Sequence, residues 1–155
     1  MSIRFAKEAD LERVNELRRE VNEVHVEGRP DVFKPGFPAE LSNYVYTIFN
    51  DPDQKIALYE RDGKIIAFAV LKRHFKPESP FSFARSFLDI DEICVDIEYR
   101  RQGIATEMMD FIRGYAKNEG FDKIELNMWE FNSGALSFYE KNGFKTYRRI
   151  MEMDI

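Results

Sequence analysis

Hydrophobic residues recur along the chain with two different spacings, and each spacing predicts a different element. Ile3 and Phe5 alternate with polar residues, which is typical of a short β-strand. Over residues 10–26 the spacing changes to every third or fourth position, which predicts one apolar face of an amphipathic helix. Helical spacing returns over residues 41–49. The intervening residues 28–38 contain three prolines and two glycines, so an irregular loop is expected there.

The pattern in the middle of the chain predicts β-strands. Two β-rich runs, residues 55–60 and 64–72, flank an Asp62-Gly63 pair that suits the positive φ angles of a tight hairpin turn. Residues 73–86 contain two prolines and little periodicity, which predicts a loop. The run FLDIDEICV, residues 87–95, predicts the next strand.

Helical and strand patterns alternate in the last third of the chain. A helix is predicted from Ile104 to near Gly120, and Asn132 and Gly143 flank a second, shorter helix. Strands are predicted at residues 123–129 and 146–155, the latter with Met151, Met153 and Ile155 on one face. The order β-α-α-β-β-β-α-β-α-β predicts a mixed α/β (α+β) fold. No repeat or linker interrupts it, so residues 1–155 are expected to form a single domain.

Charge and cysteine content exclude some classes of protein. The net charge is −5, whereas a nucleic-acid-binding domain usually has a basic balance. The single cysteine, Cys94, excludes an intramolecular disulfide and a cysteine metal cluster, so no metal is expected. The N-terminus carries charges and no apolar signal core, and no run approaches the length of a membrane span. A cytoplasmic protein, with no membrane or nucleic-acid partner, is therefore expected.

The stretch YRRQGIA, residues 99–105, joins a predicted strand to a predicted helix. The first amides of a helix have no partner within the helix and carry the positive end of its dipole, so such a junction suits a phosphate group. Gly103 would let a phosphate approach the backbone, and Arg100 and Arg101 add positive charge. In the alternative interpretation, Gly103 only permits a turn and the arginines are solvated.

Two motifs in this region resemble those of the GNAT superfamily of N-acetyltransferases. Arg100-x-x-Gly103-x-Ala105 is similar to the family's Q/R-x-x-G-x-G/A signature, within ICVDIEYRRQGIATEMM. Downstream, NMWEFNSGALSFYEKNGF resembles the motif N-x-x-A-x-x-F-Y-x-x-x-G-F. The resemblance implies a mostly antiparallel mixed sheet with a splayed parallel strand pair and flanking helices. It also implies an acyl-CoA N-acyltransferase with acetyl-CoA as cosubstrate.

The resemblance assigns roles to individual residues. Loop amides would hold the pyrophosphate of coenzyme A, and the preceding strand would pair with its pantetheine arm. Asn132 would bond the pantetheine arm, or serve only as a helix N-cap. Tyr139 would be the general acid that protonates the departing thiolate, or a buried structural tyrosine. The implied cofactor-binding residues are Ile93, Cys94, Val95, Arg100, Arg101, Gln102, Gly103, Ile104, Ala105, Thr106, Asn132 and Tyr139.

An amine acceptor arrives protonated, so a base is needed. Glu92 is the preferred candidate and Asp91 the second, while solvated carboxylates at a strand end are the alternative. Two-residue alternation puts Asp89 and Asp91 on one face and Glu92 on the other, unless a β-bulge changes the phase. His25 is expected to be a surface or partly packed residue, although it lies where the family builds its acceptor pocket.

The sequence therefore predicts an N-acetyltransferase that acts on a primary amine by direct attack. The acceptor side would be built by residues 20–45 and 73–86, and the acidic residues in the first of these segments favour a cationic small molecule or peptide. The alternatives are a non-catalytic acyl-CoA sensor and a small interaction domain. The terminal strand often pairs between subunits in relatives, which leaves a homodimer open.

Overall fold

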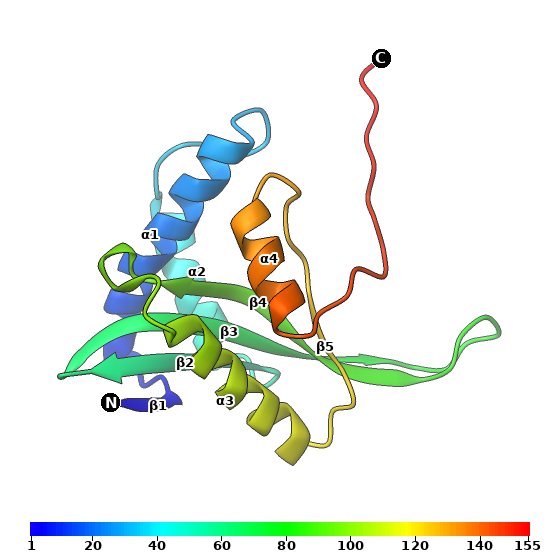
Figure 1. The fold of residues 1–155 in the computed structure, drawn as a ribbon, viewed down its shortest axis with the longest axis horizontal. Helices are drawn as coiled ribbons and strands as arrows, with labels where there is room; N and C mark the ends of the chain where they lie inside the picture. The colour runs from blue at the N-terminus through cyan, green and yellow to red at the C-terminus, as the bar shows by residue number, and fades with distance from the viewer.

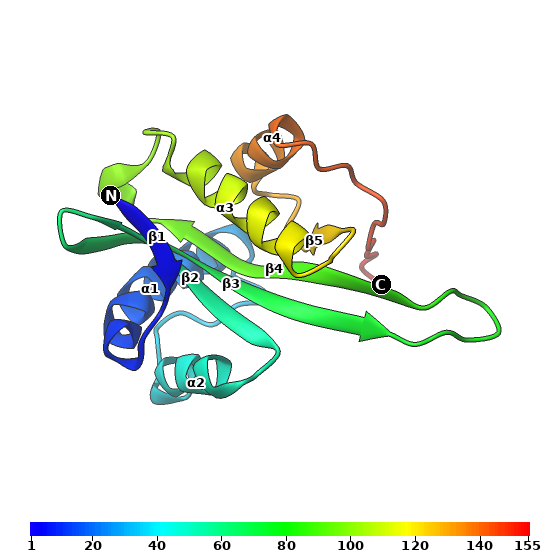
Figure 2. The same ribbon diagram turned by 90° about the horizontal axis from the view of Figure 1, so that it is seen from below.

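A computed structural model describes residues 1–155, in which five strands form one mixed sheet. The strands follow one another in the order β1-β2-β3-β4-β5; β4 and β5 are parallel and every other pair is antiparallel. Figures 1 and 2 show the strongly twisted sheet and the long hairpin that projects from one end of it. The strands are β1 (Ser2–Phe5), β2 (Gln54–Arg61), β3 (Lys64–Lys76), β4 (Arg85–Val95) and β5 (Ile124–Leu126).

Helices cover both faces of the sheet, as Figure 2 shows. The helices α1 and α2 pack on one face, and α3 and α4 pack on the other. The central strand β3 is therefore buried on both sides, and Ile65 through Leu71 form an uninterrupted apolar run. The helices are η1 (Glu8–Asp10), α1 (Leu11–Gly28), α2 (Ala39–Asn50), η2 (Ile97–Tyr99), α3 (Ile104–Asn118) and α4 (Ser133–Lys141).

Side-chain alternation along β3 divides the core into two layers. Phe68 and Val70 pack with Leu11, Val14 and other residues of the α1–α2 layer. Ala67, Ala69 and Leu71 pack instead with α3, through Met108, Ile112 and neighbouring side chains. Full burial of a side chain such as that of Phe68 contributes on the order of 2–3 kcal/mol. The two layers fix the ends of α1 and α3 on opposite sides of β4.

Most predicted elements are confirmed. The hairpin turn lies at Asp62 and Gly63, whose φ angles are +52° and +74°. The helix predicted over residues 10–26 spans Leu11–Gly28, and the helix beginning at Ile104 ends before Gly120. The mixed sheet with a parallel β4–β5 pair and flanking helices is also confirmed. No helix combines the length and apolarity required to span a bilayer.

The bounds of two predicted elements were wrong, and one predicted strand is absent. Residues 73–76 extend β3 and pair with residues 85–88 of β4, so the loop is confined to residues 77–84. The strand predicted at 123–129 is only Ile124–Leu126. Residues 146–155 are not a strand, because none of their backbone groups is hydrogen-bonded to the sheet. Alternation predicts how a strand's side chains are divided between two faces, but pairing requires a neighbouring edge.

Candidate active site

The parallel strands β4 and β5 separate after three residue pairs. Leu88, Asp89 and Ile90 are opposite Ile124, Glu125 and Leu126, and pairing stops there. The strand β4 continues to Val95 with β3 on one side and no strand on the other. The backbone edge of residues 91–95 is therefore free of a strand partner, and the expected splayed pair is confirmed.

The chain passes from the end of β4 through η2 and a short turn into α3. At this turn Gly103 is the N-cap of α3 with φ +82°, and Arg101 also has a positive φ of +62°. No atom lies within 4 Å of the position that a Cβ on Gly103 would occupy. A ligand can thus approach the backbone here without meeting a side chain.

The backbone amides of six consecutive residues at this turn donate no hydrogen bond within the protein. The first intrahelical or capping bond at this end of α3 is donated by the Glu107 amide to the Gly103 carbonyl, at 3.1 Å. Unpaired amides at a helix N-terminus suit a phosphate or diphosphate. The donor set therefore fits the diphosphate of coenzyme A. The six residues are Arg101, Gln102, Gly103, Ile104, Ala105 and Thr106.

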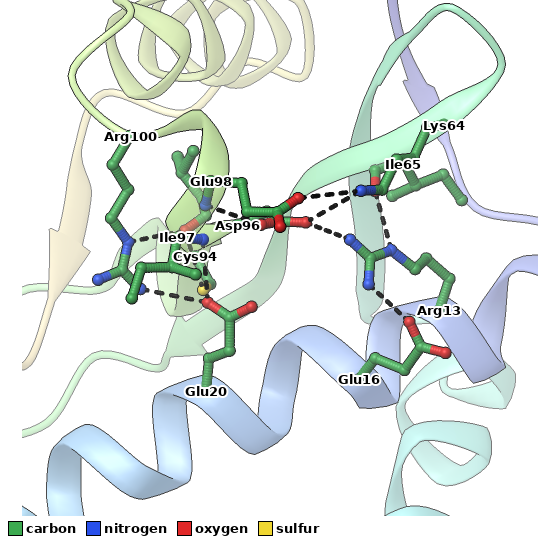
Figure 3. A network of polar contacts seen from close by, with 11 residues as sticks. Arg13, Glu16, Glu20, Lys64, Ile65, Cys94, Asp96, Ile97, Glu98 and Arg100 are labelled. Atoms are coloured by element: carbon green, nitrogen blue, oxygen red, sulfur yellow. Dashed lines mark hydrogen bonds and ion pairs between the residues drawn. The ribbon is translucent and has the colours of Figure 1, made fainter.

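Arg100 fixes the turn to the strand that precedes it, rather than extending freely into solvent. Its Nε donates a hydrogen bond to the Val95 carbonyl at 3.0 Å, and its Nη2 contacts Glu20 of α1 at 3.3 Å. Figure 3 shows this side chain folded back against the end of β4. The sequence predicted a charge at the rim of a phosphate site, and the first arginine is partly neutralised by Glu20.

Asp96 holds the other side of the same junction. Its buried carboxylate accepts a hydrogen bond from the Glu98 amide at 3.0 Å and pairs with Arg13 of α1 (Figure 3). Burial alone would raise the pKa of Asp96, but the bonds from Glu98 and Arg13 outweigh it and hold that pKa below its usual value. The ionised carboxylate thus ties the start of η2 to α1.

A β-bulge in β4 changes which acidic side chains share a face. Val70 of β3 is opposite Glu92 and Leu71 is opposite Ile90, so Asp91 is the extra residue. The alternation expected for Asp89, Asp91 and Glu92 was therefore wrong in its phase. Asp91 is exposed on the bulge, and Glu92 points toward α1.

Glu92 is paired with a buried arginine. Arg18 of α1 is 6% exposed, and its Nε donates to the Glu92 carboxylate at 3.0 Å. Arg18 also donates to the Leu41 carbonyl at 2.7 Å, so it connects α1, α2 and β4. Proton uptake by Glu92 would have to weaken this ion pair, a constraint that no local sequence signal revealed.

Asp89 lies two residues before the bulged Asp91 and has a different environment. Burial first, and then the charge of Asp91, raise the pKa of its carboxyl, against a smaller opposing effect of His74. The His74 Nε2 lies 3.6 Å from this carboxylate. A buried carboxyl with a raised pKa can exchange a proton nearer to neutral pH than an ordinary aspartate can.

Tyr139 and Asn132 come from α4, on the side of the sheet opposite to Glu92. Tyr139 packs beside Phe138 and Phe144, and burial raises the pKa of its phenol. Burial is the only cause of this shift, and no hydrogen bond from the hydroxyl to a protein side chain contributes to it. The Asn132 side chain accepts from the Ala135 amide at 3.2 Å, which confirms that it is the N-cap of α4.

An aromatic cluster closes the region between α1 and the start of α4. His25 stacks on Phe33 at 5.0 Å between centroids and meets the edge of Phe131, while Trp129 packs against Phe33. His25 is half-buried against these rings, as expected for a partly packed histidine, and burial lowers its pKa. The spacing of residues along the chain does not reveal this cluster, because its members come from segments about 100 residues apart. Gly28 is the one sequence feature related to the cluster: only a residue without a side chain fits there, because an added Cβ would lie 2.3 Å from the Phe131 ring.

Cys94 faces the α1–α2 layer and is not available as a nucleophile. Its side chain is 7% exposed, and burial, with the charge of Glu20, raises the pKa of the thiol to about 12. The thiolate is the reactive form of cysteine, so this residue acts as a small apolar side chain. Any contribution of Cys94 to ligand binding must come from its backbone.

Taken together, the features define a mixed α/β protein with a glycine turn of unpaired amides beside a split pair of parallel strands. The chain matches the model of the acetyltransferase (GNAT) family over residues 4–144, and it belongs to that family. Enzymes of the family use acetyl-CoA as cosubstrate. The resemblance inferred from the two sequence motifs is confirmed.

Solved structures and curated proteins agree with this assignment. A mutant of the BH1408 protein from Bacillus halodurans is similar with a TM-score of 0.95 and 29% identity, over 100% of this chain and 99% of that chain. Aminoglycoside N-acetyltransferase AAC(6')-Iy, solved in complex with CoA, shares the fold with a TM-score of 0.77 at 17% identity, over 99% of this chain and 93% of that chain. N-alpha-acetyltransferase 30 of Schizosaccharomyces pombe is 43% identical over 53 residues, 34% of this chain. That match spans only 35% of the curated relative's length.

Proposed function

We propose that this protein transfers an acetyl group from acetyl-CoA to a primary amine. The observation that carries the proposal is the row of six unpaired amides around Gly103, directly beside the unpaired edge of β4. The amides of residues 101–106 would hold the diphosphate, and the backbone of residues 93–95 would bind the extended arm of the same molecule. Acetyl-CoA would supply an activated thioester at the split between β4 and β5.

Tyr139 is proposed as the group that supplies a proton to the departing sulfur. Burial raises the pKa of its phenol, which keeps the proton on the oxygen at neutral pH. No side-chain hydrogen bond contributes to the pKa of this phenol, which supports the role because a phenol engaged elsewhere would have to exchange partners.

Glu92 and Asp91 are proposed as the groups that remove a proton from the acceptor. Glu92 extends from β4 toward α1, the side opposite to Tyr139, so the two groups would act on opposite sides of the reacting bond. The pairing with Arg18 holds the Glu92 carboxylate in one position. Asp91 is more exposed and has no ion-pair partner, so it would exchange protons through water.

Removing the base tests this assignment. Glu92→Gln is expected to lower kcat about 100-fold, since general bases contribute roughly that factor. Loss of the charge also leaves Arg18 buried without its partner, so thermal unfolding must be followed in parallel. Asp91→Asn is the matched comparison on the bulge. A larger loss in Asp91→Asn would move the role to Asp91, and unchanged rates in both variants would rule out both residues.

A cationic acceptor is favoured by the acidic groups that α1 presents. Glu23 and Glu27 line a cavity of about 430 Å³ between α1 and the loop that follows it, with Arg19 on the same wall. Asp31 is already paired with Arg29, so it contributes less to the local charge than the sequence suggested. The hairpin of residues 73–86 projects from the end of β4 that is opposite to Gly103 (Figure 1). The acceptor side is therefore proposed to be built mainly by residues 20–45.

The decisive experiment incubates the protein with acetyl-CoA and a panel of polyamines, aminoglycosides, amino acids and peptides, and measures the coenzyme A thiol released. Turnover with a cationic amine is the expected result. Turnover only with neutral or acidic amines would overturn the proposal of a cationic acceptor, but not the proposed acetyltransferase activity. Binding of coenzyme A without turnover on any amine would favour a non-catalytic sensor instead.

A further inference from the structure

The four rings of the aromatic cluster around His25 come from three segments that meet at the end of α1. His25 is on α1, Phe33 is in the loop that follows it, and Trp129 and Phe131 are in the loop between β5 and α4. Both loops lie at the top of Figure 1. Each ring has two neighbours in the cluster, at centroid separations of 5.0, 5.3, 6.3 and 6.3 Å. Spacings of this size are direct aromatic contacts, so a ligand can meet only the outer faces of the cluster.

The aromatic cluster is separate from both layers of the core. None of its members packs into either layer, whereas the core rings of Tyr59 and Phe68 are completely buried. Trp129 is 36% exposed and Phe131 is 37% exposed. Apolar side chains that gather at an exposed position mark a binding surface, whereas singly scattered ones do not. The packing of the core therefore does not account for the cluster.

Two members of the cluster follow directly on the split between β4 and β5. Pairing of these strands ends at Leu126, and the chain reaches Trp129 three residues later and Phe131 two residues after that. Phe131 immediately precedes Asn132, the N-cap of α4 and one of the expected cofactor-binding residues. The cluster therefore borders the split at which the thioester is proposed to lie.

His25 connects the cluster with the proposed base. It follows Arg18 by seven residues, about two turns of α1, so the two side chains share a face of that helix, and Arg18 pairs with Glu92. Seven residues correspond to about 10 Å along the helix axis. Burial lowers the pKa of His25, and the nearby charge of Glu92 raises it by less. An amine nitrogen placed beside Glu92 can thus reach the cluster through a substituent of a few carbon atoms.

We propose that the acceptor is a primary amine joined by a short chain to an aromatic ring, and that the outer faces of Trp129 and Phe131 bind this ring. The inference rests on the proposed function, since it names the acceptor of that same transfer. The amine nitrogen would form a bond to the acetyl carbon while the carbon–sulfur bond breaks. The protonated amine loses two protons, of which the departing sulfur takes one and solvent takes the other. The products are the N-acetylated amine and the coenzyme A thiol.

The surface of the cluster favours an aromatic substituent over a polar one. Aromatic rings pack against one another by stacking or by edge-to-face contact, and the stacked Trp129 and Phe131 offer such surfaces. A polyamine or an aminoglycoside would lose water from its polar groups there, while the carbon faces of the rings provide no hydrogen bond in exchange. Arg29 lies over the Trp129 ring at 5.2 Å. Its charge is paired with Asp31 and Glu152, which reduces its repulsion of a cationic amine.

Trp129 is the sole tryptophan of the chain, so its fluorescence reports on the cluster without any assay of activity. Titration of the protein with 2-phenylethylamine in the presence of coenzyme A is expected to give a saturable change, and ethylamine is expected to give none at the same concentrations. With acetyl-CoA, kcat/KM is expected to be about 100-fold higher for 2-phenylethylamine than for ethylamine, because burial of an aromatic ring contributes about that factor.

The fluorescence and the turnover separate this inference from the proposed function. An unchanged fluorescence with 2-phenylethylamine would overturn the aromatic acceptor, whether or not other amines are acetylated. A saturable change without turnover of any amine would support the ring site and contradict the proposed acetyl transfer. Equal kcat/KM for 2-phenylethylamine and ethylamine would overturn the aromatic acceptor and leave the transfer standing.

Gly28→Ala tests the position of Phe131 without removing any functional group. Because an added Cβ at Gly28 would lie 2.3 Å from the Phe131 ring, alanine must displace that ring, although alanine is the better helix former. The variant is expected to raise KM for 2-phenylethylamine about tenfold and to change kcat by less than about threefold, since it alters binding of the ring rather than the chemical step. Phe33→Leu keeps an apolar side chain in the cluster, removes one ring, and is expected to act in the same direction.

Gly114→Ala is the matched control on α3, where no atom lies within 4 Å of an added Cβ. It is expected to leave both KM and kcat at the values of the native protein. A native KM in both Gly28→Ala and Phe33→Leu, or an equal rise in Gly114→Ala, would overturn the assignment of the cluster to the acceptor.

Discussion

Gly103→Val is expected to weaken coenzyme A binding by about 100-fold or more, the largest effect on binding that the structure predicts. Gly103 has a φ of +82°, a conformation that a β-branched residue adopts only with strain. Its missing side chain also leaves the six surrounding amides accessible. A valine would distort the turn and occupy the space where a phosphate must approach. A loss of about 100-fold corresponds to roughly 2.7 kcal/mol of binding free energy.

The other end of the same helix provides a matched control. Gly120 follows α3 with a φ of +81°, and it too has no atom within 4 Å of an added Cβ. Gly120→Val should therefore lose a similar amount of folding stability, about 1–2 kcal/mol, without any effect on the cofactor. Isothermal titration calorimetry and thermal unfolding on both variants separate the two contributions. Equal coenzyme A affinity in Gly103→Val and Gly120→Val would show that the cofactor binds elsewhere.

Tyr139→Phe is expected to lower kcat by about 100-fold or more while leaving coenzyme A affinity unchanged. The substitution removes only the phenolic oxygen, which is the proposed proton donor to the departing sulfur, and keeps the ring that packs against Phe138 and Phe144. Because burial raises the pKa of this phenol, the native enzyme should hold its acid protonated through neutral pH. Activity of the native enzyme should then fall only as the pH rises through that raised pKa.

Tyr115 is the matched control for this experiment. It lies on α3 at the edge of the same apolar layer, its pKa is also raised by burial, and it packs against Phe5. Tyr115→Phe should leave both kcat and coenzyme A affinity close to those of the native protein. Steady-state rates and calorimetric affinities for the two variants provide the comparison. A kcat for Tyr139→Phe within a few-fold of the native value would assign Tyr139 a structural role.

The two arginines of the junction illustrate how far local sequence reasoning extends into the site. The sequence located the turn because the chemistry of a helix N-terminus depends on neighbouring residues, and Gly103 is required by local backbone conformation. The sequence did not reveal that Arg100 bonds to the Val95 carbonyl and to Glu20, because Glu20 is 80 residues away. The charge available to a ligand at this turn is thus smaller than the composition of the loop suggested.

The acidic residues of β4 show the same limit within a single strand. The sequence supplied three candidate carboxylates, and strict alternation placed Asp91 and Asp89 together. The bulge at Asp91 breaks this alternation, and pairing with β3 determines where the bulge lies. The ion pair between Glu92 and Arg18 depends on the packing of α1 against β4, which no spacing within β4 encodes.

The sequence alone determined the elements that depend on neighbours along the chain: the helices, the Asp62-Gly63 hairpin, the glycine turn before α3 and the Asn132 cap. These follow from apolar periodicity, backbone freedom and capping, which act over a few residues. Tertiary structure alone decided the phase of β4, the partner of Glu92, the aromatic cluster around His25 and the unpaired course of residues 145–155. Each of these depends on which distant segment lies opposite, and spacing along the chain does not encode that.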